Sequence, residues 1–312
     1  MKTQILKKSE INKAAEIIKS GGLVAFPTET VYGLGANAFN SDAVKKIFAA
    51  KKRPADNPLI VHVLSLKQAE KCAYLNKNAK KLIDKFWPGP LTIVLRKKAI
   101  VPREVTASLN NIAIRMPRNK IALELIEKSN CPIAAPSANL AGKPSSTCFK
   151  HVQDDLSGRI NAIIKSEDCE IGIESTVINL TSKQPILLRP GKITLEQLRK
   201  ILPNLKIANN TSERPSSPGM KYKHYSPKAK VILFERNISK INYYRKKYER
   251  YGKKVRVLQI KNLKKSSKKL FKTFRKLDEE KTDYILVLGC PEKGIGLALM
   301  NRLKKAAHRI IL

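Results

Sequence analysis

The residues best suited to chemistry lie in the segment PIAAPSANLAGKP, residues 132–144. Small apolar residues at 133–135 predict a buried strand, and Pro136 ends it because proline cannot donate to a sheet ladder. Ser137 and Asn139 follow directly, so a hydroxyl and a carboxamide lie at the carboxyl end of that strand. Ligands of α/β proteins bind at such strand ends. The segment therefore predicts a binding site for a polar ligand.

Two upstream segments have the same character, a short apolar run joined to a polar loop. They are FPTETVYGLGANAF at residues 26–39 and AKKRPADNPLIVHV at residues 50–63. His62 is the one histidine within an apolar strand pattern, where a histidine satisfied in the core is the ordinary interpretation. Three polar loops within the length of one domain predict a single composite site.

Cationic side chains are the candidates for binding phosphate or carboxylate groups. The sequence has no GxxxxGK segment and no GxGxxG at the start of a helix, so side chains and loop amides would hold a nucleotide. An arginine at a strand end can bind such a group through two hydrogen bonds. The candidates are Lys51, Arg53, Arg115, Arg118 and Arg189. No GxSxG surrounds Ser137, so we expect a site that positions reactants and neutralises charge, without a protein nucleophile.

These segments resemble the YrdC-type family, the threonylcarbamoyl-AMP synthases. The paired signature of that family, Lys-x-Arg and Ser-x-Asn, is present as KKR at residues 51–53 and SAN at residues 137–139. Resemblance covers nearly the whole chain and is weakest after residue 227. The other matching motifs are PTETVYGL (27–34), WPGPLT (87–92), IRMP (114–117), ESTV (174–177), LLRPG (187–191) and SPGMKYKHYSP (217–227).

The resemblance implies an L-threonylcarbamoyladenylate synthase, a nucleotidyltransferase that uses L-threonine, bicarbonate or CO2, and ATP. Its product serves threonylcarbamoyladenosine modification of tRNA next to the anticodon, which a separate transferase complex completes. Lys51 and Arg53 are implied to stabilise charge, and Mg²⁺ is implied to be held mainly by ATP, with no protein ligands. The implied threonine-binding residues are Thr30, His62, Arg115, Ala135 and Ser175. The implied ATP-binding residues are Arg53, Asn57, Asn111, Ser137, Asn139, Ser145, Arg189 and Tyr225.

The fold class expected is α/β, with a YrdC-like twisted mixed sheet of about seven strands in residues 1–202. Residues 203–227 are rich in Ser, Pro and Asn and are expected to be a linker. The resemblance makes the stretch 217–227 a lid that closes over the nucleotide. Residues 228–312 alternate strand and helix patterns, which predicts a small three-layer, Rossmann-like domain.

Charge and composition bear on partners and compartment. The formal net charge is +37, and residues 228–312 hold 25 Lys+Arg against 7 Asp+Glu. We interpret the C-terminal excess as a general lysine bias, because lysine outnumbers arginine and few aromatic residues are interleaved. The five cysteines form no CxxC, and we find neither a signal peptide nor a membrane span. These features indicate a cytoplasmic protein without a membrane partner.

Two alternative functions remain open on the sequence. The first is a double-stranded RNA-binding, tRNA-binding or ribosome-associated protein that uses the basic surface without catalysis. The second is a related enzyme that makes a carbamoyl-adenylate for metallocentre maturation. That architecture should carry cysteine-rich zinc modules, and this chain has none.

Overall fold

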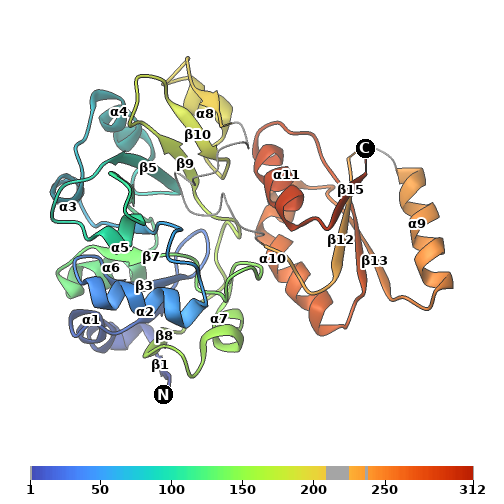
Figure 1. Ribbon diagram of the computed structural model, residues 1–312, viewed down its shortest axis with the longest axis horizontal. Coiled ribbons are helices and arrows are strands. Elements are labelled where there is room, and N and C mark those ends of the chain that lie inside the picture. Colours follow the sequence, from blue (N-terminus) through green and yellow to red (C-terminus); the bar gives the residue numbers. More distant parts are fainter. Residues whose placement is uncertain (1, 209–224, 236–237, 312) are drawn as a thin grey trace. The chain divides into compact units, whose positions relative to one another are not determined.

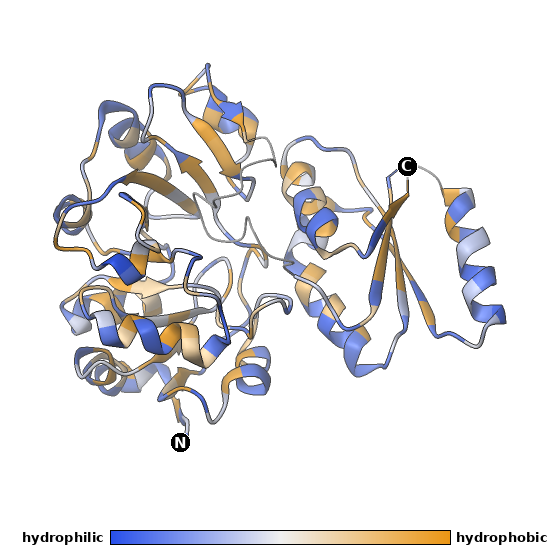
Figure 2. Ribbon diagram, in the orientation of Figure 1, coloured by the Kyte–Doolittle hydropathy of each residue, from blue (hydrophilic) through white to orange (hydrophobic). Residues whose placement is uncertain are grey.

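The computed structural model describes residues 2–208, 225–235 and 238–311. The described residues form two compact units (Figure 1). The first unit comprises residues 2–141 and 145–208, and the second comprises residues 142–144 and 225–311 without 236–237. Each unit contains its own sheet, and in both the strands are coloured mainly as hydrophobic (Figure 2).

The first unit is built on a mixed sheet, which has eleven strands within the described residues. Parallel and antiparallel neighbours both occur, as when β4 pairs with β6 in parallel and with β7 in antiparallel orientation. The order across the sheet is β1 (Gln4–Leu6), β8 (Ala162–Ile164), β2 (Val24–Phe26), β3 (Gly33–Asn37), β7 (Ile133–Ala135), β4 (Ile60–His62), β6 (Asn111–Arg115), β5 (Leu91–Arg96), β9 (Thr176–Asn179), β10 (Ile186–Arg189) and β11 (Lys206–Ile207).

Short amphipathic helices cover this sheet. α1 and α6 pack on each other, and their apolar residues, such as Ile18 and Leu125, form one core cluster with Phe26 and Ile133 of the strands. The described helices of this unit are α1 (Ile11–Lys19), α2 (Ser41–Lys51), α3 (Leu66–Cys72), α4 (Lys77–Phe86), α5 (Arg103–Thr106), α6 (Lys120–Ser129), α7 (Phe149–Leu156) and α8 (Leu195–Arg199), with a 3-10 turn at Lys8–Glu10.

The mixed α/β fold class is confirmed, but the expectation of about seven strands was too low. Strand β3 is informative because its sequence, GLGAN, has little strand character. A Cβ on Gly35 would lie 2.7 Å from Ile133 and 2.8 Å from Phe26. Glycine is needed here because the Phe26 ring fills the space beside the strand. Packing between neighbouring strands thus explains why β3 forms, although the strand propensity of its residues does not predict it.

The second unit is a three-layer α/β domain with a parallel sheet. Its strand order is β13 (Val255–Gln259), β14 (Tyr284–Leu288), β12 (Lys230–Phe234) and β15 (Arg309–Ile311), and all three pairings are parallel. α9 (Ile238–Arg250) lies on one side of these strands, and α10 (Leu263–Glu279) and α11 (Ile295–Ala306) lie on the other (Figure 1). The sequence predicted this alternation except for the last strand.

The stretch expected to be a linker, residues 203–227, is described only in part. Strand β11, near the start of this stretch, pairs with β10 and so extends the sheet of the first unit. Residues 209–224, which include most of the expected lid, lie outside the described residues. No helix that the structure describes is long and apolar enough to cross a membrane.

Candidate functional site

Strand register places the candidate residues of the first unit on one face of its sheet. His62 and Arg115 are direct neighbours on β4 and β6, and Ala135 lies opposite Ile60 on β7. Successive side chains of a strand alternate between faces, so positions two apart share a face. Asn111 and Arg115 therefore share that face, at opposite ends of β6. Rising about 3.3 Å per residue, the strand separates them by roughly 13 Å.

A buried polar cluster surrounds Arg115. Its Nη1 donates to Thr30 Oγ1 at 2.9 Å, its Nε donates to the carbonyl of Gly89 at 3.2 Å, and its Nη2 lies 2.7 Å from Glu29 Oε1. Thr30 is also within 2.8 Å of Thr28 through their hydroxyls. The guanidinium and the Glu29 carboxylate are each about 4% exposed, so a buried ion pair forms the base of this cluster.

The loop that follows β2 positions Thr30 and Glu29, and a rigid turn positions Gly89. Thr28 Oγ1 bonds the Val31 carbonyl at 2.6 Å, which closes the loop after Pro27. The Gly89 amide donates to the Met116 carbonyl at 2.8 Å, so the WPGP turn is tied to the end of β6. Both supports lie in motifs that the sequence singled out, yet neither motif revealed that they meet at Arg115.

His62 lies beside this cluster as a neutral side chain. Burial, followed by the positive charge of Arg115, lowers the pKa of His62 to about 3. The ring packs edge-on against Phe26, with ring centres 5.9 Å apart. Among the described residues its Nδ1 has no hydrogen-bond partner. A buried imidazole with one unused nitrogen can give or accept one hydrogen bond to a polar ligand.

Lys51 anchors the loop that carries Ser137 and Asn139. α2 ends at Lys51 because Lys52 adopts a left-handed conformation, with φ 52°. The Lys51 ammonium is buried and donates to the Ser137 carbonyl at 2.6 Å and to the Asn139 carbonyl. The KKR and SAN segments, 86 residues apart, are therefore joined directly. This lysine holds the loop in shape and places a positive charge beneath it.

Arg53 lies just beyond this anchor and is half-buried. Its Nη2 donates to the carbonyls of Asn57 at 3.2 Å and Pro58 at 3.1 Å. The side chain of Asn57 is buried, and its Oδ1 has no hydrogen-bond partner within the described part of the chain. Arg53 and Asn57 thus belong to one loop, which leads into β4 and His62.

A second arginine centre lies at the start of β9. Arg189 donates from Nε to the Ser175 carbonyl at 3.0 Å and from Nη2 to the Ser175 hydroxyl at 3.1 Å. The same hydroxyl lies 2.7 Å from Thr92 Oγ1. Ser145, in turn, donates to Glu174, the neighbour of Ser175. Strand β5, which contains Thr92, lies between β6 and β9 and so connects this centre to the strand of Arg115.

An apolar floor lies on the same face of the sheet. It consists of Ile60, Val94, Ala113, Val177 and Leu188, which form one core cluster. Ala113 lies between Asn111 and Arg115 on β6. A polar rim around an apolar floor suits a ligand with an aromatic ring and charged groups.

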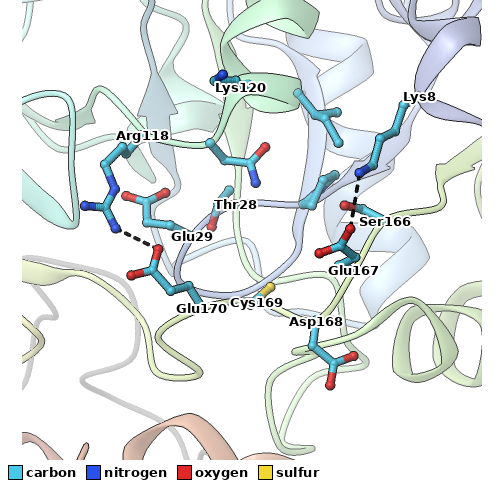
Figure 3. Close-up of a pocket in the computed structure, with 13 residues that line it drawn as sticks. Lys8, Thr28, Glu29, Arg118, Lys120, Ser166, Glu167, Asp168, Cys169 and Glu170 are labelled. Atoms are coloured by element: carbon cyan, nitrogen blue, oxygen red, sulfur yellow. Dashed lines mark hydrogen bonds and ion pairs between the residues drawn. The ribbon is translucent and has the colours of Figure 1, made fainter.

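Thr28 and Glu29, which belong to the Arg115 cluster, also line a pocket of about 290 Å³ (Figure 3). Arg118 lies there and pairs with Glu170 at 2.7 Å, with both side chains more than half exposed. Lys8 faces Glu167 at 3.7 Å across the same pocket. Arg118, which the sequence offered as a phosphate-binding candidate, therefore shares this pocket with Thr28 and Glu29 and pairs with Glu170.

Tyr225 is placed in the second unit. Its ring stacks on Phe271 with centres 5.2 Å apart, and the Arg302 guanidinium lies 5.8 Å from the ring centre. The side chain of Tyr225 is buried, and its backbone has a positive φ of 64°. Contact of Tyr225 with ATP stays a prediction.

The sequence did not single out three residues of these clusters for the contacts they make, namely Glu29, Thr92 and Glu174. Each had a usable signal. Glu29 is a lone carboxylate among polar loop residues, Thr92 interrupts the apolar run LTIVL, and Glu174 precedes Ser175. Among the described residues, no three His, Cys, Asp or Glu side chains are grouped to hold a metal ion.

Comparison with known proteins covers almost the whole chain. The Sua5/YciO/YrdC family model, described as telomere recombination, matches residues 16–191. A second model, described as the threonylcarbamoyl-AMP synthase C-terminal domain, matches residues 193–308.

Individual relatives agree with these matches. A threonylcarbamoyl-AMP synthase of Pyrococcus abyssi is 46% identical over 98% of this chain and 96% of its own length. The enzyme of the same name from Bacillus subtilis is 45% identical over 96% of this chain and 93% of its own. The crystal structure of P. abyssi Sua5 complexed with L-threonine matches with a TM-score of 0.95 and 45% identity, over 100% of this chain and 99% of that one.

Proposed function

The chain belongs to the Sua5/YciO/YrdC family and synthesises threonylcarbamoyl-AMP, and we propose that the Arg115 cluster is where it binds L-threonine. The observation that carries this assignment is the buried Arg115 guanidinium, surrounded by Thr30, Glu29 and His62 on one sheet face. A buried arginine is the side chain best suited to a carboxylate, because its planar fork matches two oxygens. His62 Nδ1 and Thr30 Oγ1 are suited to the remaining polar groups of the amino acid.

ATP binds, in this proposal, along the floor and the two loops beside it. Asn57, Ser137 and Asn139 lie on the loops held by Arg53 and Lys51. Ser145 and Arg189 lie in the second arginine centre, where Arg189 donates to Ser175, which we assign to L-threonine. Asn111 lies roughly 13 Å from Arg115 along β6, a spacing that suits a long ligand beside a small one. Tyr225 would contact the same ATP from the lid.

The chemistry uses the reactants themselves as nucleophiles. The threonine amine forms a bond to the carbon of CO2 or bicarbonate and becomes a carbamate, with release of a proton from the amine in the first case and of water in the second. A carbamate oxygen then attacks the α-phosphorus of ATP, the bond to the β-phosphate breaks, and pyrophosphate leaves. The protein contributes position and positive charge, and Lys51, Arg53 and Arg189 supply that charge. No serine or cysteine of the cluster is needed as a nucleophile.

Magnesium is part of this proposal as an ion that enters with ATP. The side chains near the two loops are mainly cations and neutral hydrogen-bonding groups, a donor set suited to phosphate oxygens and not to a bare cation. When bound, the ion would neutralise charge on the phosphates. Lys51 would hold the loop beneath them through its two carbonyl contacts.

The product is an activated intermediate, and its chemistry requires an acceptor. We propose a cytoplasmic enzyme whose adenylate serves threonylcarbamoylation of the adenosine next to the anticodon of tRNA. A separate transferase complex would carry out that transfer. A lid over the site would limit hydrolysis of the adenylate before it leaves.

One assay tests the reaction and the reactants together. The full chain is incubated with ATP, magnesium, L-threonine and labelled bicarbonate, and pyrophosphate and labelled adenylate are measured. Release of pyrophosphate should require threonine and bicarbonate together. Equal release when water is the only acceptor would overturn the proposal.

A further inference from the structure

α9 of the second unit has one face against the sheet and one face in solvent. Ile241 is buried, and Tyr244 and Tyr248 pack with Phe234 and Tyr284 of the strands. The inner face of α9 is therefore explained by the core of the domain.

The outer face of α9, together with the residue that follows the helix, carries a strip of five residues, Tyr243, Lys246, Lys247, Arg250 and Tyr251, which line a hollow of about 700 Å³. Their spacing of three, four, seven and eight positions from Tyr243 is that of one helical face. The two tyrosines are 63% and 72% exposed. Among the tyrosines that the structure describes, the only other one with an exposed side chain is Tyr74.

The strip is positively charged and contains no carboxylate. Within the described residues, no acidic side chain lies within 4.0 Å of the cationic groups of Lys246, Lys247 or Arg250. Glu249, the one acidic residue of α9, pairs with Arg245 at 2.9 Å. The three cations of the strip are therefore available to an anionic partner.

We propose that this strip binds a single-stranded segment of RNA. Cationic side chains bind the phosphates, and exposed aromatic rings stack with unpaired bases. A rise of 1.5 Å per residue places the two tyrosines roughly 12 Å apart, with the three cations between them. Duplex RNA does not offer unpaired bases for such stacking.

Two other partners fit the strip less well. A helix that lies on a membrane surface needs a broad apolar face in contact with lipid, and here the apolar face of α9 is packed on the sheet. An acidic protein segment would match the charge but would give no reason for two exposed rings at the ends of the strip. Two rings at the ends of the strip, with three cations between them, suit two unpaired bases and the phosphates that join them in a single strand.

This arrangement changes the interpretation of the C-terminal charge. The sequence showed few aromatic residues among the lysines and favoured a general lysine bias. In α9, Tyr244 and Tyr248 instead pack against the sheet, whereas Tyr243 lies on the solvent side with the cations. The proposal concerns a surface of the second unit and does not depend on the assignment of the catalytic residues.

Fluorescence anisotropy of the full chain with a labelled 12-nucleotide oligouridylate tests the proposal. We expect the double variant Tyr243→Ala/Tyr251→Ala to bind the oligouridylate at least about 10-fold more weakly, because it removes both rings on which bases would stack. We expect the triple variant Lys246→Gln/Lys247→Gln/Arg250→Gln to reduce the slope of log affinity against log salt by about 2, since each phosphate contact contributes about 0.7. Both variants should retain synthesis of the adenylate.

The matched control is Lys265→Gln/Lys268→Gln/Lys269→Gln, which removes the same charge from exposed positions of α10. Retained binding in this control supports the strip. An equal loss in control and strip variants would overturn the proposal, because binding would then follow net charge alone. Absence of oligouridylate binding by the unmodified chain would also overturn it, as would tighter binding to a hairpin duplex or to phosphatidylserine vesicles.

Discussion

Arg115 Nη2 lies 2.7 Å from Glu29 Oε1, and both side chains are buried. The two residues lie 86 positions apart, one at the end of a strand and one in a loop, and each side chain is only about 4% exposed. A buried pair of this kind is costly to break from one side, because the remaining charge is left uncompensated. If L-threonine binds at Arg115 as proposed, the stability of the first unit should depend on the charge of that amino acid.

Glu29→Gln should destabilise the protein by about 3–5 kcal/mol, because it leaves the Arg115 charge buried without its partner. L-Threonine should then restore more stability to this variant than to the unmodified chain, since its carboxylate supplies the missing charge. Thermal unfolding with and without threonine measures both effects. Glu170→Gln is the control, because its pair with Arg118 is exposed and is worth less than about 1 kcal/mol. An equal threonine shift in all three proteins would contradict the assignment of Arg115.

Lys51→Met should lower both stability and activity. The substitution keeps the length of the side chain but removes the donor to the carbonyls of Ser137 and Asn139. The Ser137 carbonyl would keep its bond from the Asn139 amide, while the loss of the donor to the Asn139 carbonyl should cost about 1–3 kcal/mol and loosen the loop that we propose binds ATP. Lys52→Met is the matched control, because the neighbouring side chain is exposed. Urea unfolding and the KM for ATP are the measurements, and similar values for the two variants would be evidence against the anchor.

Arg53→Ala should reduce adenylate synthesis far more than Lys265→Ala. A charge-assisted hydrogen bond to a substrate is worth about 1.5–3 kcal/mol, which corresponds to a loss of roughly 10- to 150-fold. Lys265 is exposed on α10 and makes no contribution to the first unit's sheet face. Initial rates at saturating and limiting ATP separate binding from turnover. Losses of the same size in both variants would rule out a substrate role for Arg53.

Stability should fall as pH is lowered from about 6.5 toward 3 through the titration of His62. The folded pKa of about 3 lies below the unfolded value of 6.5, so in this window the unfolded state binds the extra proton. Stability from the neutral ring is fully present above pH 6.5 and is lost progressively toward pH 3, at up to about 1.4 kcal/mol per pH unit.

His62→Gln should flatten this part of the stability curve, because glutamine does not titrate. Denaturant unfolding at several pH values between 4 and 8 provides the comparison. His308→Gln is the control, since His308 belongs to the second unit and is exposed. If the curves of the His62 variant and the unmodified chain have the same slope, the ring is not held neutral.

The sequence by itself determined the family, the α/β class and the identity of most candidate residues. Short motifs such as KKR and SAN carry that information because the types of the residues and their spacing are read directly from the sequence. Alternating patterns after residue 228 likewise predicted the second unit, since each of its helices has one clearly apolar face.

Only the tertiary structure decided which of these residues meet. Strand order brings His62 and Arg115 side by side and places Ala135 on the next strand, opposite Ile60, although the three come from separate segments. The tertiary structure also shows that Lys51 contacts the Ser137 carbonyl and that Glu29 lies beside Arg115. Each of these pairs is separated by 86 residues, and no pattern in the sequence predicts a contact at that distance along the chain. Strand β3 was missed for the same reason, since its glycines are selected by the Phe26 ring across the sheet. Likewise, packing of α9 on its sheet decided which tyrosines face solvent, and a sequence pattern rich in both lysine and tyrosine could not.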